Sequence, residues 1–247
     1  MQKHKKKGAN PNIAQSQLLP RYIIELSRLS DHKWRQVIQS WARAGNCSTG
    51  APHSTPKNVY DYMLARHRMT PRDVEELCKE AESTSMISLD RGNEKGYFWL
   101  PPMAKASKFI AILYPEIDLN GGSYRLRIEM VTIGSDSGMT VEKAIEYRFE
   151  SPGPGSIHDY HHAQLTSVNS KDGVGAPNWL PDGIPCMPVP ARNPITGLFA
   201  AILSLYGIDV FEEFLSMIDV PKDYRNEFMM FVRPSRNIRA FEVVCHG

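Results

Sequence analysis

Two segments in the middle of the chain alternate between apolar and charged side chains, and this alternation restricts the fold more than any other feature. In residues 124–133 three apolar side chains alternate with three charged ones: Leu126, Ile128 and Met130 with Arg125, Arg127 and Glu129. In residues 144–150 the pattern recurs: Ile145, Tyr147 and Phe149 alternate with Glu146, Arg148 and Glu150. A period of two is typical of a β-strand with one buried face. The two segments therefore predict neighbouring strands of a sheet with one apolar and one charged face.

Two further strands are predicted on either side of this pair. The continuous apolar run 109–114 is typical of a buried strand, and residues 158–168 predict a fourth strand. The turn signal Asn120-Gly121-Gly122 and the Pro-Gly-rich segment 151–155 separate the runs. Short turns between alternating runs predict an antiparallel four-stranded meander.

The first third of the chain has the period of helices. Residues 21–29 predict one helix, and the run that follows Ser30 and stops at Gly45 predicts a second. The pairs Thr55-Pro56 and Thr70-Pro71 each combine an N-cap residue with a proline at the first helical position. The sequence therefore predicts a helical unit that precedes the sheet.

The part of the chain after the strands predicts helices again. Residues 194–206 and 210–218 predict two helices with a break at Gly207, and residues 228–232 and 240–244 predict a closing hairpin. The predicted fold class is α+β: an N-terminal helical unit, the antiparallel four-stranded meander, and C-terminal helices with the closing hairpin. Three regions follow: a basic tail over 1–17, the helical unit over 18–84, and the sheet with its helices over 85–247.

Composition excludes several classes of protein. The net charge is only +2, so no global field favours a polyanionic partner, and the positive charge is concentrated in a tail with Lys5, Lys6 and Lys7. That tail could touch phosphate or be merely solvated. The four cysteines form no Cys-x-x-Cys pair, which indicates free thiols. Without a secretory signal or a run of about 18 apolar residues, we expect a cytoplasmic protein that does not bind a membrane.

The charged face of the predicted sheet is the candidate site. If Leu165 and Ala163 face the core, His161 joins them and His162 lies on the charged face. Histidine can act as acid or base near neutral pH, and arginine can clamp phosphate with two donors. These roles predict phosphodiester cleavage with a catalytic group and a nucleic-acid-binding group: His162, Glu150, Arg148 and His158 in the first, Arg125, Arg127, Lys5, Lys6 and Lys7 in the second. The alternative is that the charges only keep an exposed face soluble.

A metal site is not predicted. The segment from His158 to His162 is the densest cluster of ligand-type residues, but a strand would place only His158 and His162 on one side. Its spacing matches no standard zinc signature, which requires three or four ligands. The sequence leaves any cofactor unknown.

The residues Tyr147-Arg148-Phe149-Glu150, followed by the stretch from His158 to Leu165, resemble an element of small uncharacterised bacterial proteins, some of them associated with toxin–antitoxin or phage-defence loci. The stretch from Trp179 to Gly207 resembles them as well. With the charged face, the resemblance predicts an intracellular effector or accessory protein of such a system that acts on nucleic acid, as a nuclease. The alternative is a non-catalytic subunit that binds a partner protein through the helical unit or through the loop 169–194.

Overall fold

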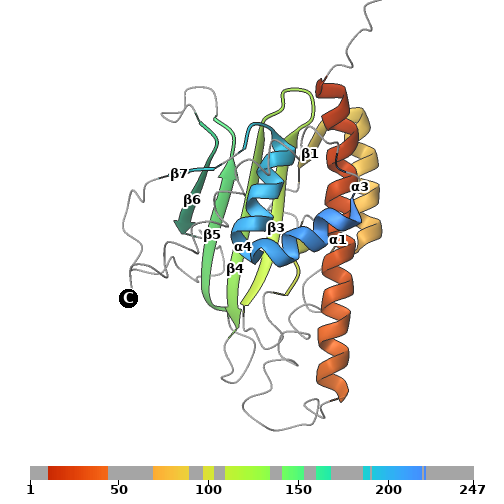
Figure 1. The fold of residues 1–247 in the computed structure, drawn as a ribbon, viewed down its shortest axis with the longest axis vertical. Helices are drawn as coiled ribbons and strands as arrows, with labels where there is room; N and C mark the ends of the chain where they lie inside the picture. The colour runs from red at the N-terminus through yellow and green to blue at the C-terminus, as the bar shows by residue number, and fades with distance from the viewer. Residues whose placement is uncertain are drawn as a thin grey trace, which may run out of the picture.

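The computed structural model describes residues 11–43, 69–88, 97–102, 109–133, 141–152, 160–167, 186–189, 191–218 and 220. In these residues an antiparallel sheet is covered by helices (Figure 1). The chain therefore has the α+β fold that its sequence predicts. Residues 1–10 of the predicted basic tail lie outside the described residues, whereas residues 11–17 of that tail belong to the first helix. The helix that starts at Pro56, the closing hairpin and most of the loop 169–194 also lie outside the described residues.

The sheet has seven strands, three more than the four that the sequence predicts. Four strands lie near the predicted segments: β3 (Phe109–Asp118), β4 (Tyr124–Ile133), β5 (Val141–Glu150) and β6 (His162–Ser167). Three short strands add to them: β1 (Met86–Ser88), β2 (Phe98–Trp99) and β7 (Met187–Pro188). The strand order is β1-β3-β4-β5-β6-β7, with β2 also paired to β3, and every pairing is antiparallel. Two- and three-residue strands are too short to show a period in the sequence.

The register of the sheet agrees with the alternation. Leu126 pairs with Phe149, which pairs with Ala163, and this row faces the core. Arg125 pairs with Glu150, which pairs with His162, so these three share the opposite face. The prediction that His162 lies on the charged face is therefore confirmed.

Helix α1 (Pro11–Arg43) is one continuous helix of 33 residues, so the prediction of two helices divided at Ser30 is wrong. Ser30 is buried within α1, and its hydroxyl donates to the carbonyl of Leu26 at 2.7 Å. A serine can satisfy its hydroxyl on the preceding turn in this way without ending the helix. Pro20 also lies inside α1.

Helix α3 (Pro71–Thr84) begins where the sequence predicts. The Thr70 side chain accepts from the amide of Asp73, and the Asp73 carboxylate accepts from the amide of Thr70 at 2.7 Å. This reciprocal capping box satisfies two amides that the first turn leaves unpaired. The buried stripe of α3 consists of Val74, Cys78 and Ala81.

Helix α4 (Pro194–Met217) is broken at Gly207, as predicted, where φ is 74° and ψ is −174°. That backbone conformation suits glycine because it has no Cβ. Asn193 caps α4 by accepting from the amide of Thr196 at 2.9 Å. Among the described residues α4 alone is long and apolar enough to cross a membrane, a test that core helices also pass, and 56% of its most apolar window is buried.

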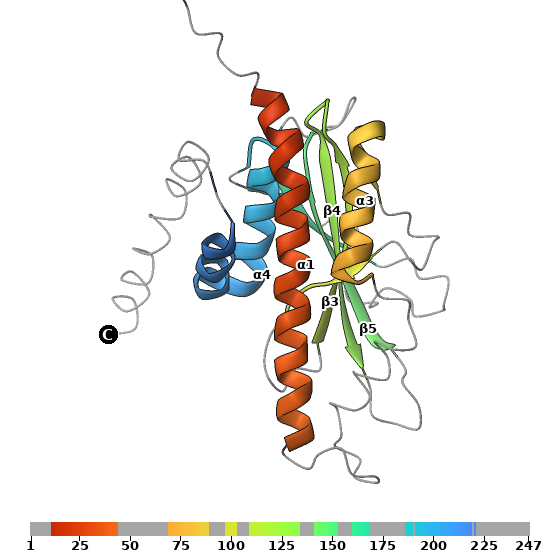
Figure 2. The same ribbon diagram turned by 90° about the vertical axis from the view of Figure 1, so that its right-hand side faces the viewer.

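The three helices share one hydrophobic core with the sheet. α4 lies over β4 and β5 (Figure 1), and α1 runs between α4 and α3 (Figure 2). The core includes fully buried side chains from each layer: Leu26 and Tyr22 of α1, Val74 of α3, Phe199 and Phe211 of α4, and Leu113, Leu126 and Phe149 of the sheet. The opposite face of the sheet carries the charged side chains together with buried apolar residues of β3, Ile110 and Ile112.

Candidate functional site

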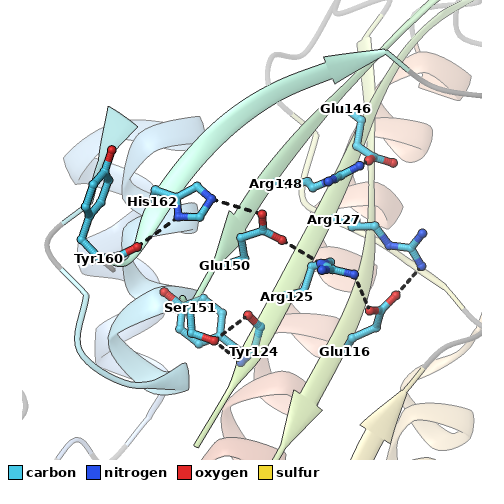
Figure 3. A network of polar contacts seen from close by, with 10 residues as sticks. All are labelled: Glu116, Tyr124, Arg125, Arg127, Glu146, Arg148, Glu150, Ser151, Tyr160 and His162. Carbon is cyan, nitrogen blue, oxygen red and sulfur yellow. Dashed lines mark hydrogen bonds and ion pairs between the residues drawn. The ribbon is translucent and has the colours of Figure 1, made fainter. Parts of the chain in front are cut away.

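The candidate site is a network of polar side chains on the face of the sheet opposite the helices (Figure 3). His162 Nε2 lies 3.1 Å from Glu150 Oε1 across the β5–β6 pair. The second oxygen, Glu150 Oε2, accepts from Arg125 Nε at 2.7 Å across the β4–β5 pair. Three predicted site residues on three neighbouring strands are therefore in direct contact.

Glu116 of β3 extends the network, and the sequence analysis did not single it out. Its carboxylate lies 3.6 Å from Arg125 Nη1 and 2.6 Å from Arg127 Nη2. The Arg127 guanidinium also lies over the Tyr114 ring, 5.7 Å from its centroid. One carboxylate thus holds both of the arginines that we predicted to bind nucleic acid.

Arg148, which we predicted in the catalytic group, contacts a carboxylate of its own strand. Its Nε lies 3.2 Å from Glu146 Oε1, on its own strand. Nearby, the Tyr114 hydroxyl donates to Glu129 Oε2 at 3.2 Å. Each of the three described arginines of this face, Arg125, Arg127 and Arg148, is therefore ion-paired with a carboxylate.

Burial separates this face from an ordinary solvated sheet surface. The side chains of His162 and Glu146 are only 4% and 2% exposed, and Glu129 is buried too. Arg125 is the most exposed, at 51% of its side chain, and Arg148 and Glu116 are partly exposed at 34% and 30%. The alternative that the charges only keep an exposed face soluble does not account for the buried members.

Both ring nitrogens of His162 face oxygen atoms inside the protein. Nδ1 lies 3.1 Å from the main-chain oxygen of Tyr160, and Nε2 lies 3.1 Å from Glu150 Oε1. A carbonyl oxygen can only accept, so Nδ1 carries hydrogen in this contact. The Glu150 carboxylate in turn contacts Arg125 through its other oxygen. His162 is therefore held by β5 on one side and by the main chain just before β6 on the other.

His161 points to the other face, as predicted, and contacts Tyr124. The two rings stack with centroids 5.5 Å apart, and His161 Nδ1 lies 3.1 Å from the Tyr124 hydroxyl. Burial lowers the pKa of His161, and the neighbouring His162 lowers it further. Burial and the charge of Glu150 raise the pKa of Tyr124. His161 and Tyr124 therefore form a neutral contact on the face of the sheet opposite the contact of His162 with Glu150.

The network carries no excess positive charge. Four carboxylates belong to it (Glu116, Glu129, Glu146 and Glu150), against three guanidinium groups and the His162 ring. Glu150 and Glu116 raise the pKa of Arg125, with Glu150 the larger cause. A surface with no excess positive charge gives no electrostatic attraction to a polyphosphate.

The structure does not describe the other predicted site residues, which are His158, Lys5, Lys6 and Lys7. Among the residues that the structure describes, no three histidine, cysteine or acidic side chains are grouped to hold a metal ion. Cys186, just before β7, is close enough to Glu150 and Arg148 to feel both charges, and burial and Glu150 raise its pKa.

A second feature lies in the helical layer. A groove of about 820 Å³ runs between α1 and α3. Its lining includes Pro20, Ile24, Cys78, Ala81 and Leu119, with Arg21, Lys79 and Glu82 among the charged residues around them. The sequence analysis assigned no residue here, because side chains on two helices give no signal of a groove until their packing is known.

Comparison with known proteins adds no constraint on this site: no protein-family model, no curated protein and no solved structure matches the chain.

Proposed function

We propose that this chain is a non-catalytic subunit that binds a partner protein in the groove between α1 and α3. The observation that carries the proposal is the groove itself, whose lining combines apolar side chains with a larger share of polar and charged ones. Arg21, Lys79 and Glu82 are exposed. A desolvated apolar centre with a charged rim is the usual organisation of a protein interface.

The polar network supports a role without catalysis. A general acid or base must reach the proton that it transfers. Both nitrogens of His162 already face acceptors inside the protein, and its side chain is 4% exposed. The dyad therefore offers no ring nitrogen to a substrate, and its main effect is to hold β5 and β6 together.

Reversal of charge at the groove margin tests the proposal. The doubly substituted Arg21→Glu/Lys79→Glu protein should bind its partner at least about tenfold more weakly, since margin charges steer and orient association. The partner would be sought among the products of neighbouring genes and its affinity measured by calorimetry. Arg72→Glu is the matched control, because Arg72 lies on α3, is 86% exposed and does not line the groove. Equal affinities for the parent and the double variant would refute the groove as the interface.

Action on nucleic acid is the second candidate, and the exposed Arg125 favours it. An exposed guanidinium can exchange a carboxylate for a phosphate at small cost. The purified protein should then cleave nucleic acid, and Glu150→Ala and His162→Gln should remove the cleavage. Absence of cleavage in the parent would remove this second candidate and leave only the proposal of a non-catalytic subunit. The link to bacterial toxin–antitoxin or phage-defence systems and the cytoplasmic location stay predictions.

A further inference from the structure

The turn between β3 and β4 contains the dipeptide Asn120-Gly121, which occurs once in the chain. Both residues are exposed. When glycine follows an asparagine, its main-chain nitrogen can attack the asparagine side-chain amide, because no Cβ hinders the approach. This reaction, deamidation, converts the asparagine to aspartate or isoaspartate. The residue types alone therefore mark Asn120 as a site of spontaneous modification.

The hydrogen bonds of this turn require a glycine at position 121. Asp118 Oδ1 accepts from the main-chain amides of Asn120 and Gly121, each at 2.9 Å. A Cβ added to Gly121 would lie 2.2 Å from Asp118 Oδ2, well inside contact distance, so a larger residue would displace the Asp118 carboxylate. The turn thus depends on the glycine that makes Asn120 susceptible.

The same carboxylate opposes the reaction. Attack on the side-chain amide requires the Gly121 nitrogen to lose its hydrogen. That hydrogen is donated to the Asp118 carboxylate, and a hydrogen bond to a charged acceptor is stronger than one to a neutral acceptor. The folded turn therefore holds the attacking nitrogen in its unreactive, protonated form.

The group under attack is held as well. Nδ2 of Asn120 donates to Ser85 Oγ, at the end of α3, at 2.7 Å. Ser85 is fixed in turn, since its amide donates to the carbonyl of Ala81 and its carbonyl accepts from the amide of Leu119, both at 2.8 Å. The Asn120 side chain must give up an anchored partner before it can rotate.

We propose that Asn120 is a latent deamidation site, which Asp118 and Ser85 keep unreactive in the folded protein. In the reaction the Gly121 nitrogen loses its proton to hydroxide and bonds to Cγ of Asn120. The Cγ–Nδ2 bond breaks, and the nitrogen leaves as ammonia after it takes a proton from water. Water then opens the cyclic imide at either carbonyl, which gives aspartate or isoaspartate.

The product would change the lining of the groove between α1 and α3, because Asn120 and Ser85 both belong to that lining. A carboxylate at position 120 can no longer donate to Ser85 Oγ. It also places a negative charge near the C-terminal end of α3, where the helix dipole disfavours it. Deamidation would therefore loosen the turn from α3. The assignment of the site does not depend on a partner in the groove.

Mass spectrometry of the tryptic peptide 109–125 measures the reaction, since Asn120 is the only asparagine in that peptide. The conversion of amide to acid shifts its mass, and chromatography separates isoaspartate from aspartate. The folded protein at neutral pH should react at least about tenfold more slowly than the same protein unfolded in urea, because a hydrogen bond to a charged acceptor is worth about that factor. Equal rates in the two states would overturn the proposal.

Two variants separate the two contacts. Asp118→Ala removes the acceptor of the Gly121 amide and should raise the rate in the folded protein on the order of tenfold. Ser85→Gly removes the hydroxyl and suits the positive φ of 59° at this position, and it should raise the rate about two- to tenfold. In urea both variants should react as fast as the parent, and circular dichroism checks that each one folds.

Ser83→Ala is the matched control. Ser83 also lies on α3 and its hydroxyl donates to the main-chain oxygen of Glu80, so the rate should stay that of the parent. A folded Asp118→Ala or Ser85→Gly protein that reacts as slowly as the parent would overturn the role of that residue. A Ser83→Ala protein that reacts as fast as Asp118→Ala would overturn the assignment to these two contacts.

Discussion

A close approach of α4 to the sheet makes a quantitative prediction at Gly197. A Cβ added to Gly197 of α4 would lie 2.3, 2.4 and 2.6 Å from Cζ, Cε2 and the hydroxyl oxygen of Tyr124. Ordinary contacts between carbon atoms are about 3.5–4.0 Å. Gly197→Ala therefore requires the ring or the helix to move by more than an ångström.

The Tyr124 ring has little freedom to move. It is 4% exposed, it stacks on His161, and its hydroxyl lies 3.1 Å from His161 Nδ1. Overpacking of a rigid core costs about 1–3 kcal/mol, and the fixed ring places this site at the upper end, near about 3 kcal/mol. For a chain of this length that corresponds to a fall in Tm of roughly 6–12 °C.

Urea unfolding followed by circular dichroism measures the loss, and two backgrounds test its cause. Tyr124→Phe keeps the two ring carbons that the new Cβ would meet, so Gly197→Ala should still cost about 2–3 kcal/mol there. Tyr124→Leu removes the ring, and the added cost of Gly197→Ala should then fall below about 1 kcal/mol. A Gly197→Ala protein within about 0.5 kcal/mol of the parent, or an equal cost in both backgrounds, would refute the reasoning.

Three further predictions use single groups. Burial raises the pKa of the Cys78 thiol to about 12, so in a variant without the other cysteines iodoacetamide should modify Cys78 only as fast as the protein unfolds; rapid modification of the folded protein would contradict this. Thr70→Ala should cost about 1 kcal/mol in urea unfolding through loss of the α3 cap, whereas Thr70→Ser should cost much less; equal losses would rule out the cap as the cause. Because the folded state lowers the pKa of His161, its contribution to stability is complete above about pH 6.5 and is lost as the pH falls below that value. Unfolding free energy should therefore drop less between pH 7 and pH 5 in His161→Gln than in the parent, and an equal drop would count against a neutral His161.

The sequence predicts the register of the sheet because a period of two leaves little freedom. Once Leu126 and Phe149 are buried, Arg125, Glu150 and His162 must share the opposite face. The start of α3 could be predicted equally well, since the Thr70 cap and the fixed backbone angle of Pro71 both act within one turn. Local geometry decides both features.

Features that depend on contacts between distant segments could not be predicted from the sequence. Ser30 has the residue type of an N-cap, yet α1 continues through it, because packing of the helix on the core outweighs a local preference. Glu116 was missed because β3 is apolar on both faces: Ile110 and Ile112 lie on the charged side and are fully buried. An alternating pattern therefore does not appear in that strand.

The sequence also did not predict which side chains of the network pair with each other. Alternation places Arg148 and Glu150 on one face, but it does not say that Arg148 turns to Glu146 while Glu150 takes Arg125 and His162. Nor does it say that the face is largely buried. Both facts support the structural role that we propose for the dyad, because an acid or base must be reachable.

The accessibility of the His162 ring tests the central claim most directly. Diethyl pyrocarbonate modifies imidazole nitrogens that solvent can reach, and mass spectrometry of the peptides locates the modified histidines. The account predicts that His162 stays unmodified in the folded protein, since its side chain is 4% exposed and both ring nitrogens face oxygen atoms of the protein. Rapid modification of His162 in the folded protein would contradict the account and would restore this residue as a candidate general base.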